Sequence, residues 1–502
     1  MKFFKKNLVN NNEEASLARP LAGQLLLCAG LAIFWVIFIW GFWHKGIYAL
    51  GINFFIFLSL LCGLFLGIIY KKVKFSINDL IWFVPIFLII LSFLIYDNPF
   101  LKIISLLILS VIFGFFYNYL ILDNKEARHW DFYFLLKIIK RIFSFLGEIG
   151  LSIILYLELI IPASKNNKRI IAKVIAGILL FLIIALTIIV PLLSSADKIF
   201  SDKMEFIYSW LKEHFSFILM YKIITSIILS VLMFSMLFAW NKKFDYQEKP
   251  ETNDKIDPII SGIVLGGILA IYLFFLWVQV GRLWVGSLPF EFKDTEYFVK
   301  SGFWQLFFLS IINIVIYFFT YRKTILIVQR ILTVFTLISL LLLISAVQRM
   351  QLYVTYYGFS YEKLFALYTV IYCVILFIWL ITRLFIKSRS NIFKFLVMLF
   401  ICMYGLITIL PVEQFILRAN LKLSELKESR IRLYELTMLS PDVLPLIKKY
   451  KKEGKLKERI DYFRPGVEEF DWTPWINEKE KIVSDKKWYE RNLLNYFYSK
   501  NN

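Results

Sequence analysis

Long apolar segments alternate with short polar segments along most of the chain, and this pattern predicts membrane-spanning helices. A bilayer core of about 30 Å is crossed by roughly 20 apolar residues in an α-helix. The segments that meet this requirement are residues 21–43, 47–70, 78–96, 100–122, 170–193, 216–240, 258–281, 302–320, 325–347, 362–384 and 393–411. The sequence therefore predicts an all-α polytopic membrane protein with eleven spans, followed by a polar tail at 412–502.

The composition agrees with this class of protein. Of the 502 residues, 59% are hydrophobic and only 19% are charged, whereas soluble domains contain about 45 to 50% apolar residues. All four cysteines lie inside apolar segments, so we expect no disulfide framework. The first apolar segment is longer than a signal-peptide core of about 7 to 15 residues, and we expect it to remain as a membrane helix. Frequent Ile, Phe, Lys and Asn favour a bacterial origin.

The distribution of positive charge predicts the orientation. The chain has 57 basic and 37 acidic residues, a net charge of +20, and cytoplasmic loops retain Lys and Arg. Basic residues gather before the first span and in the loops after each even-numbered span up to the tenth, whereas loops 194–215 and 282–301 are balanced. The predicted order is a cytoplasmic N-terminus at 1–20, four spans within 21–122, a basic cytoplasmic interfacial segment at 123–169, seven spans within 170–411 and an extracytoplasmic helical tail at 412–502.

Residues 142–163 are also apolar, but we do not predict a span there. Glu148 and Glu158 would each cost about 2.5 to 3.5 kcal/mol near a helix centre, and an extra crossing would invert every later loop. We predict instead an interfacial amphipathic helix that starts at Asp131 and carries a basic stripe. Its candidate contacts with anionic lipid headgroups are Lys137, Lys140 and Arg141. Each positive charge near such a surface contributes about 1 kcal/mol.

The tail predicts a small helical domain. An uninterrupted run of Leu, Glu, Lys and Arg at 413–436 favours a helix, and a turn at Ser440 favours the start of another before 446–450. The pair that begins at Ser484 is typical of a further helix start. We interpret the tryptophans of the tail as the core or the membrane-facing surface of this domain, and these are Trp472, Trp475 and Trp488.

The sequence offers little catalytic chemistry. His44, His129 and His214 are too scattered for a metal motif, and neither a nucleophile elbow nor a phosphate-binding glycine loop occurs. Three histidines are too few for an iron oxygenase of the carotenoid class, which needs four. We therefore expect no metal, no cofactor and no nucleic-acid partner.

Several motifs resemble a known family. The end of the ninth span, Ser345-Ala346-Val347-Gln348-Arg349-Met350-Gln351-Leu352-Tyr353, is followed by Tyr357-Gly358-Phe359-Ser360. This sequence is similar to the signature of a bacterial polytopic membrane family known only as a domain of unknown function. Further similar stretches are Ser195-Ala196-Asp197, Gly302-Phe303-Trp304-Gln305, Arg418-Ala419-Asn420 and Leu439-Ser440-Pro441-Asp442. The resemblance covers about residues 170–500 and implies no known activity; one departure is Glu362-Lys363, where the family pattern has an arginine-containing sequence.

Polar residues at the predicted external ends of the spans suggest a site. Arg282 and Arg349 lie beside glutamines, and a charge at the hydrocarbon edge usually has a partner. The candidate site residues are Asp197, Arg282, Gln305, Arg349, Tyr353 and Asn420. We expect them to surround one external cavity in which an arginine pairs with Asp197 and the tail forms a lid. The alternative is that Arg349 extends to the interface and Asp197 caps a helix that begins near Lys198.

Two classes of function remain open. The first is a non-enzymatic transport, sensory or membrane-complex component of the bacterial plasma membrane, in contact with anionic lipids and with a membrane or cell-envelope protein partner. The alternative is a lipid-linked transferase or hydrolase that uses Asp197 or Asp97 as a base and an arginine to hold a phosphate.

Overall fold

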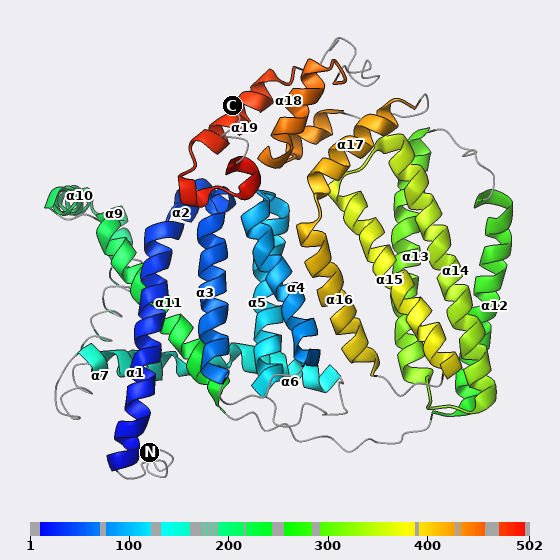
Figure 1. Cartoon of the computed structure of the whole chain (residues 1–502), viewed down its shortest axis with the longest axis horizontal. Coiled ribbons are helices and arrows are strands. Elements are labelled where there is room, and N and C mark those ends of the chain that lie inside the picture. The colour runs from blue at the N-terminus through cyan, green and yellow to red at the C-terminus, as the bar shows by residue number, and fades with distance from the viewer. Residues whose placement is uncertain are drawn as a thin grey trace. The chain divides into compact units, whose positions relative to one another are not determined.

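The structure is a computed structural model of the chain, and all the secondary-structure elements of its described residues are helices (Figure 1). It describes residues 11–70, 77–121, 132–160, 190–214, 217–242, 256–283, 292–386, 391–426, 433–456 and 471–496, with isolated positions at 174, 177, 181, 185, 189 and 431. No strand occurs within these ranges. The prediction of an all-α protein is therefore confirmed.

Helices of membrane-spanning length dominate the described chain. Eight are long and apolar enough to cross a bilayer, and a ninth is counted if the bent pair Gly23–Ile39 and Phe42–Ala49 forms one span. A shorter apolar helix covers Trp82–Ile95. The predicted fifth span at 170–193 lies mostly outside the described residues. These helices confirm a membrane protein with several spans.

The chain forms two compact units. The first comprises residues 1–76, 110–125 and 135–245, and the second comprises 77–109, 126–134 and 246–502. Helix α5 (Pro99–Ile121) contributes to both.

The first unit packs around α11. Its elements are α1 (Asn11–Phe34), η2 (Trp35–Ile39), α2 (Phe42–Lys45), η3 (Gly46–Ala49), α3 (Ile52–Ile69), α6 (Phe132–Ile142), η4 (Phe143–Glu148), α7 (Ile149–Ile160), α9 (Val190–Ala196), α10 (Lys198–His214) and α11 (Phe217–Asn241). Helix α11 contacts α1, η4 and α7. Trp240 of α11 is fully buried, and its ring centroid lies 5.5 Å from that of Phe65 and 5.4 Å from that of Tyr117.

The segment at 142–163 does not form a helix of spanning length within its described residues. It divides into η4 and α7, and α7 has only 12 residues, fewer than the roughly 20 that a crossing requires. Figure 1 shows that α6 and α7 lie across the direction of α1 and α3. The interfacial location of this segment stays a prediction.

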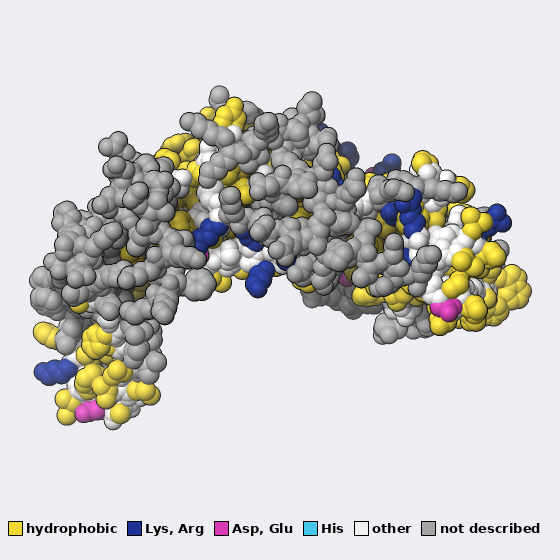
Figure 2. Space-filling view, turned by 90° about the horizontal axis from the view of Figure 1, so that it is seen from below, with side chains coloured by type: hydrophobic (Ala, Val, Ile, Leu, Met, Phe, Trp, Pro, Cys, Tyr) yellow, Lys and Arg dark blue, Asp and Glu magenta, His cyan; other side chains and the backbone are white. Residues whose placement is uncertain are grey.

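The second unit contains most of the long helices. Its elements before the tail are α4 (Ile77–Ile95), α12 (Pro258–Leu283), α13 (Phe292–Thr320), α14 (Leu326–Tyr357), α15 (Tyr361–Ile386) and α16 (Ile392–Ile409). Helix α14 packs against α12, α13 and α15, whereas α4 packs against α16. Hydrophobic side chains cover much of the described surface in Figure 2, and on α12 Ile263 and Trp277 are 70% and 73% exposed. Apolar exposure of this extent is expected of helices that face lipid.

Helices α4 and α16 meet at a glycine. A Cβ at Gly405 would lie 3.0 Å from Cα and 3.1 Å from the carbonyl oxygen of Pro85. We therefore expect Gly405→Val to separate the two helices and to destabilise the protein by about 1–3 kcal/mol, measured by thermal unfolding in detergent. Gly266→Val is the control, because nothing lies within 4 Å of a Cβ there. Equal effects of the two substitutions would contradict this role for Gly405.

The tail is a small helical assembly within the second unit. Its elements are α17 (Val412–Ser424), η6 (Leu433–Met438), η7 (Pro441–Val443), α18 (Leu444–Lys452), α19 (Thr473–Ser484) and η8 (Trp488–Glu490). Trp472 and Trp475 are buried with ring centroids 5.9 Å apart, which confirms their interpretation as core residues, while Trp488 is exposed.

Two predicted helices of the tail have different limits. The helix expected over 413–436 ends at Ser424, and residues 433–438 form a 3-10 helix instead. Ser484 ends α19 and does not begin a helix. The turn at Ser440 is confirmed, because its side chain accepts a hydrogen bond from the N–H of Asp442 at the start of η7.

Candidate functional site: a buried ionic cluster

The turn between α4 and α5 places an aspartate at the ends of two helices. Pro99 begins α5, and the side chain of Asn98 accepts a hydrogen bond of 2.9 Å from the N–H of Leu101, so that Asn98 caps the helix. Asp97 precedes this cap and its side chain is fully buried. A carboxylate in such a position costs several kcal/mol unless it is paired.

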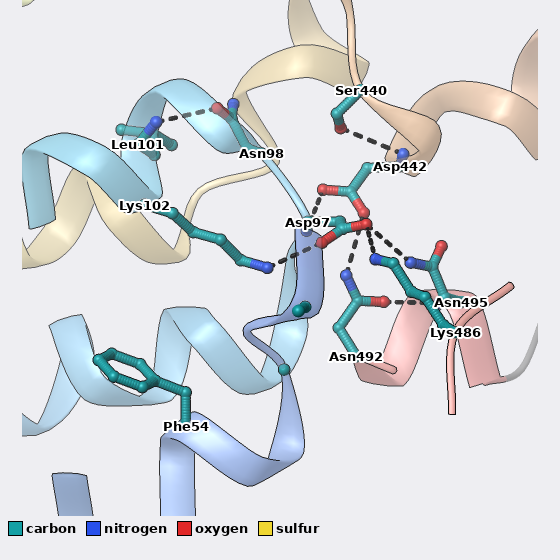
Figure 3. A network of polar contacts seen from close by, with 12 residues as sticks. Phe54, Asp97, Asn98, Leu101, Lys102, Ser440, Asp442, Lys486, Asn492 and Asn495 are labelled. Atoms are coloured by element: carbon teal, nitrogen blue, oxygen red, sulfur yellow. Dashed lines mark hydrogen bonds and ion pairs between the residues drawn. The ribbon is translucent and has the colours of Figure 1, made fainter. Parts of the chain in front are cut away.

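Two lysines and an amide hold the Asp97 carboxylate (Figure 3). Nζ of Lys102 donates to Oδ1 at 2.7 Å, from the first turns of α5. Lys486, from the end of the tail, donates to Oδ2, and Nδ2 of Asn495 donates to the same oxygen at 3.2 Å. Both lysines are buried as well. The end of the tail is therefore ion-paired to the α4–α5 turn.

A second carboxyl group lies against the backbone of the same turn. Asp442 of η7 accepts a hydrogen bond of 2.6 Å from the N–H of Asp97. Nδ2 of Asn492 donates to its other oxygen at 3.4 Å. Asp442 makes no ion pair with any described residue, although it is only 5% exposed.

A third buried carboxyl group, Glu413 near the start of α17, continues the network. It accepts hydrogen bonds from the N–H of Ser440, at 2.9 Å, and from the hydroxyl groups of Ser440 and Tyr361. The Tyr361 hydroxyl also accepts from Nδ2 of Asn98 at 3.1 Å. We call the five ionisable residues Asp97, Lys102, Glu413, Asp442 and Lys486 the buried ionic cluster.

Burial favours the neutral forms of the three members of the cluster that lie on the tail. Burial raises the pKa of Asp442 well above its usual range, and the negative charges of Glu413 and Asp97 raise it further. Burial also raises the pKa of Glu413, although its hydrogen bonds from Ser440 and Tyr361 oppose this. The pKa of Lys486 is lowered by burial, against the opposite effect of Asp97.

A small hollow lies beside two of the carboxyl groups. Glu413, Asp442, Asn98 and Tyr96 contribute to its lining, and its empty space is about 220 Å³ including the opening. Ligand pockets usually measure about 300–1,000 Å³. The part of this space that a water molecule can occupy is much smaller and suits about one water.

These features limit what the cluster can do chemically. Asp97 is shielded and paired, so it is poorly placed as a general base. In the described ranges, no group of three or more His, Cys, Asp or Glu side chains is arranged to hold a metal ion. The arrangement can join distant segments, and it can bind and release protons.

The predicted external site residues are divided between the two compact units. Asp197 belongs to the first unit, is exposed, and accepts a hydrogen bond of 2.7 Å from the N–H of Ile199 at the start of α10. The capping alternative for Asp197 is therefore confirmed. The other candidates belong to the second unit.

Arg349 lies half-buried on α14 and packs against α13. A Cβ at Gly302 would overlap its guanidinium group, so the glycine makes room for the arginine. Gln305 lies one turn further along α13 and is exposed. The side chain of Arg282, near the end of α12, lies outside the described residues. The structure thus brings Arg349 to the helix that carries Gln305.

Asn420 contacts the turn between α14 and α15 directly, and Tyr353 contacts Lys363, which binds the same turn. Asn420 accepts from the N–H of Phe359 at 2.5 Å and donates to its carbonyl at 2.8 Å. Lys363 donates to the carbonyl of Gly358 at 2.8 Å and lies 4.5 Å above the ring of Tyr353. These residues fix the turn, and Lys363 is one of the two that depart from the family pattern.

The predicted headgroup contacts differ from one another. Arg141 donates to Oδ1 of Asn118 at 2.6 Å and to the carbonyl of Trp240 at 2.8 Å, so it fastens α6 to the end of α11. Lys140 is exposed and Lys137 is half-buried. Lys140 is the most accessible of the three to lipid.

Only parts of the buried ionic cluster can be predicted from the sequence. Asp97 was a candidate base, and Ser440 with Asp442 marked a turn, but nothing in the pattern pointed to Glu413 or Lys486. A Lys two residues after the end of a helix is ordinary in a polar tail. The only sign of the site in the sequence is a weak one: the short polar loop that contains Asp97, between two apolar spans.

Fold and site define a polytopic helical membrane protein whose tail is ion-paired to its membrane helices. Residues 83–450 match the family model described as domain of unknown function DUF4153, and the chain belongs to this family. The expected resemblance is confirmed, although the match begins and ends earlier than residues 170–500. No curated protein and no solved structure matches the chain.

Proposed function

We propose that this protein is a multi-pass component of a bacterial plasma membrane that acts in transport, sensing or a membrane complex and not as an enzyme. Its N-terminus lies in the cytoplasm, and its tail at 412–502 is an extracytoplasmic domain seated on the membrane helices. The observation that carries this proposal is the buried ionic cluster, which ties the tail to the α4–α5 turn.

The connectivity supports eleven spans. Asn98 at the start of α5 is hydrogen-bonded to Tyr361 at the start of α15, so these two helix starts lie on the same side of the membrane. Helix α14 ends beside the start of α15, so its own start lies on the opposite side of the membrane, as does the end of α5. Between the end of α5 and the start of α14, the chain must then cross the membrane an even number of times. Helices α11, α12 and α13 supply three crossings, and the apolar segment at 170–193 is the natural fourth.

The exposed part of the cytoplasmic segment supports contact with anionic lipid. Lys140 is exposed on α6, and α6 lies across the direction of α1 and α3 (Figure 1). Such a placement is typical of an interfacial helix. The protein partner, in the membrane or cell envelope, would meet the exposed face of the tail.

The enzymatic alternative has weaker support. A lipid-linked transferase or hydrolase needs an accessible carboxylate near a site for an organic substrate. Asp97 is buried and paired with two lysines, the hollow beside the cluster suits about one water, and Asp197 caps a helix. We therefore favour the non-enzymatic role.

Reporter fusions test the orientation. A cytoplasmic reporter fused after Tyr246 and an extracytoplasmic reporter fused after Asn502 should both be active, and the reciprocal pair should both be silent. Loop charge and the contact between Asn98 and Tyr361 lead to this result. A cytoplasmic signal at Asn502 would overturn the proposed topology and with it the external tail.

The cellular role needs a separate test. Purification of the intact protein in native lipids should retain a protein partner, and Lys486→Met should reduce that retention by releasing the tail. Lys487→Met is a matched control, because Lys487 is exposed and forms no part of the cluster. Retention that is unchanged by Lys486→Met would contradict a partner site that depends on the seated tail.

A further inference from the structure

The charges of the buried ionic cluster do not balance. It contains three carboxyl groups and two ammonium groups, and the side chains of all five are largely removed from solvent. Both lysines donate to Asp97, which is therefore ionised. With every group charged, the cluster would keep one net negative charge, and an uncompensated buried charge costs several kcal/mol. One bound proton removes that charge.

The hydrogen bonds indicate which carboxyl group carries the proton. Glu413 accepts from one N–H and two hydroxyl groups, and such donors stabilise the charged form. Asp442 accepts one strong hydrogen bond from the N–H of Asp97, and its contact with Asn492 is long at 3.4 Å. Fewer hydrogen bonds therefore stabilise the ionised form of Asp442 than the ionised form of Glu413.

The charged and titratable groups around Asp442 come from every element that packs there. Those on the membrane helices and their turns are Tyr96, Asp97, Lys102 and Tyr361, and those on the tail are Glu413 and Lys486. The negative charges of Asp97 and Glu413 favour protonation of Asp442, while the positive charges of Lys102 and Lys486 oppose it.

Asp442 also has a route for proton exchange. It lines the hollow beside Glu413, Tyr96 and Asn98. A space for about one water next to a buried carboxyl group suffices for exchange, because a proton moves along hydrogen bonds without a large channel.

We propose that the buried ionic cluster is a proton-binding site in which Asp442 carries one exchangeable proton. Occupancy of this site keeps the tail seated on the α4–α5 turn, so that the tail responds to the proton concentration on its side of the membrane. The sensing role rests on the external tail of the proposed function, whereas the proton site itself does not.

The sign of the pH dependence follows from the direction of the shift. The pKa of Asp442 is raised in the seated tail, and release returns it to about 3.9. The seated state therefore binds more protons, and seating weakens as pH rises from about 4 toward the raised pKa, by at most tenfold per pH unit. The lowered pKa of Lys486 acts in the opposite direction, below its ordinary value of about 10.4.

Infrared spectroscopy of the full-length protein in lipid vesicles detects the proton directly. The difference spectrum between acid and alkaline pH should contain the carbonyl band of a neutral carboxylic acid that Asp442→Asn removes and Glu413→Gln retains. A band that Glu413→Gln removes and Asp442→Asn retains would place the proton on the wrong residue for this proposal. A difference spectrum that neither substitution changes would overturn the site.

Hydrogen exchange measures the consequence for the tail. Between pH 5 and 8, after correction for intrinsic exchange rates, opening of 471–496 in the wild type should increase with pH, by at most tenfold per unit. Asp442→Asn should abolish the pH dependence, because Asn keeps an acceptor toward the N–H of Asp97 and has no charge. Glu478→Gln, which removes an exposed carboxylate of α19, should preserve it. A pH dependence that survives Asp442→Asn would overturn the proposal.

The two proposals fail in different ways. A tail that is unprotected at every pH, or that lies in the cytoplasm by the reporter fusions, would defeat the proposed function. A protected external tail with no pH dependence and no Asp442 band would defeat the proton site alone.

Discussion

Asp97→Asn is expected to release the tail from the α4–α5 turn, at a cost of about 3–5 kcal/mol. The substitution removes the carboxylate that Lys102 and Lys486 share, and it leaves two buried ammonium groups beside one another. Opening of 471–496 should therefore rise by about a hundredfold or more, as measured by hydrogen exchange in lipid vesicles. Protease cleavage within the tail should rise in parallel.

A double-mutant cycle separates the ion pair from general damage. Lys486→Met leaves Asp97 paired with Lys102, so its effect should be smaller than that of Asp97→Asn. The combined variant should be less destabilised than the sum of the two single effects, because both remove the same interaction. Lys487→Met should have little effect. Additive single effects would mean that Asp97 and Lys486 do not act together.

Most of the long apolar helices could be predicted because a bilayer requires about 20 apolar residues in each helix that crosses it. The predicted segments 78–96 and 100–122 agree closely with α4 and α5. Helices α13 and α14 are longer than their predicted spans, 302–320 and 325–347. Hydropathy marks the part of a helix inside the hydrocarbon, whereas hydrogen bonding continues the helix into polar sequence at either end.

Helix limits in the tail were harder to predict because tertiary contacts decide them. The composition of 413–436 favours one long helix, yet the chain leaves α17 after Ser424, and Leu436 and Leu439 are buried further on. Local propensity is worth a few tenths of a kcal/mol per residue, so the burial of two leucines outweighs it.

The buried ionic cluster could not be predicted from the sequence pattern. Asp97 and Lys486 are 389 positions apart, and no periodicity relates two loop residues at that separation. The sequence indicates only that a charge at the hydrocarbon edge usually has a partner. By contrast, Asn420 and Tyr353 could be selected by family resemblance, and the structure brings both to the α14–α15 turn.

Asn420→Ala is expected to loosen this turn and to destabilise the protein by about 2–4 kcal/mol. The N–H and carbonyl groups of Phe359 lose partners at 2.5 and 2.8 Å, and each buried group left unsatisfied costs about 1–3 kcal/mol. Thermal unfolding in detergent and hydrogen exchange at 357–363 measure the loss.

Asn420→Asp distinguishes a structural role from ligand binding. Its carboxylate still accepts from the N–H of Phe359 but faces the carbonyl oxygen to which the Asn420 amide donates. The variant should therefore be at least as unstable as Asn420→Ala at neutral pH, and it should recover at acid pH, where a protonated carboxyl group donates to that carbonyl. Gln305→Ala, at an exposed position, is the control. If both Asn420 variants unfold like the wild type at every pH, the side chain does not hold the turn, and a role in ligand binding becomes the better explanation of its place beside α14 and α15.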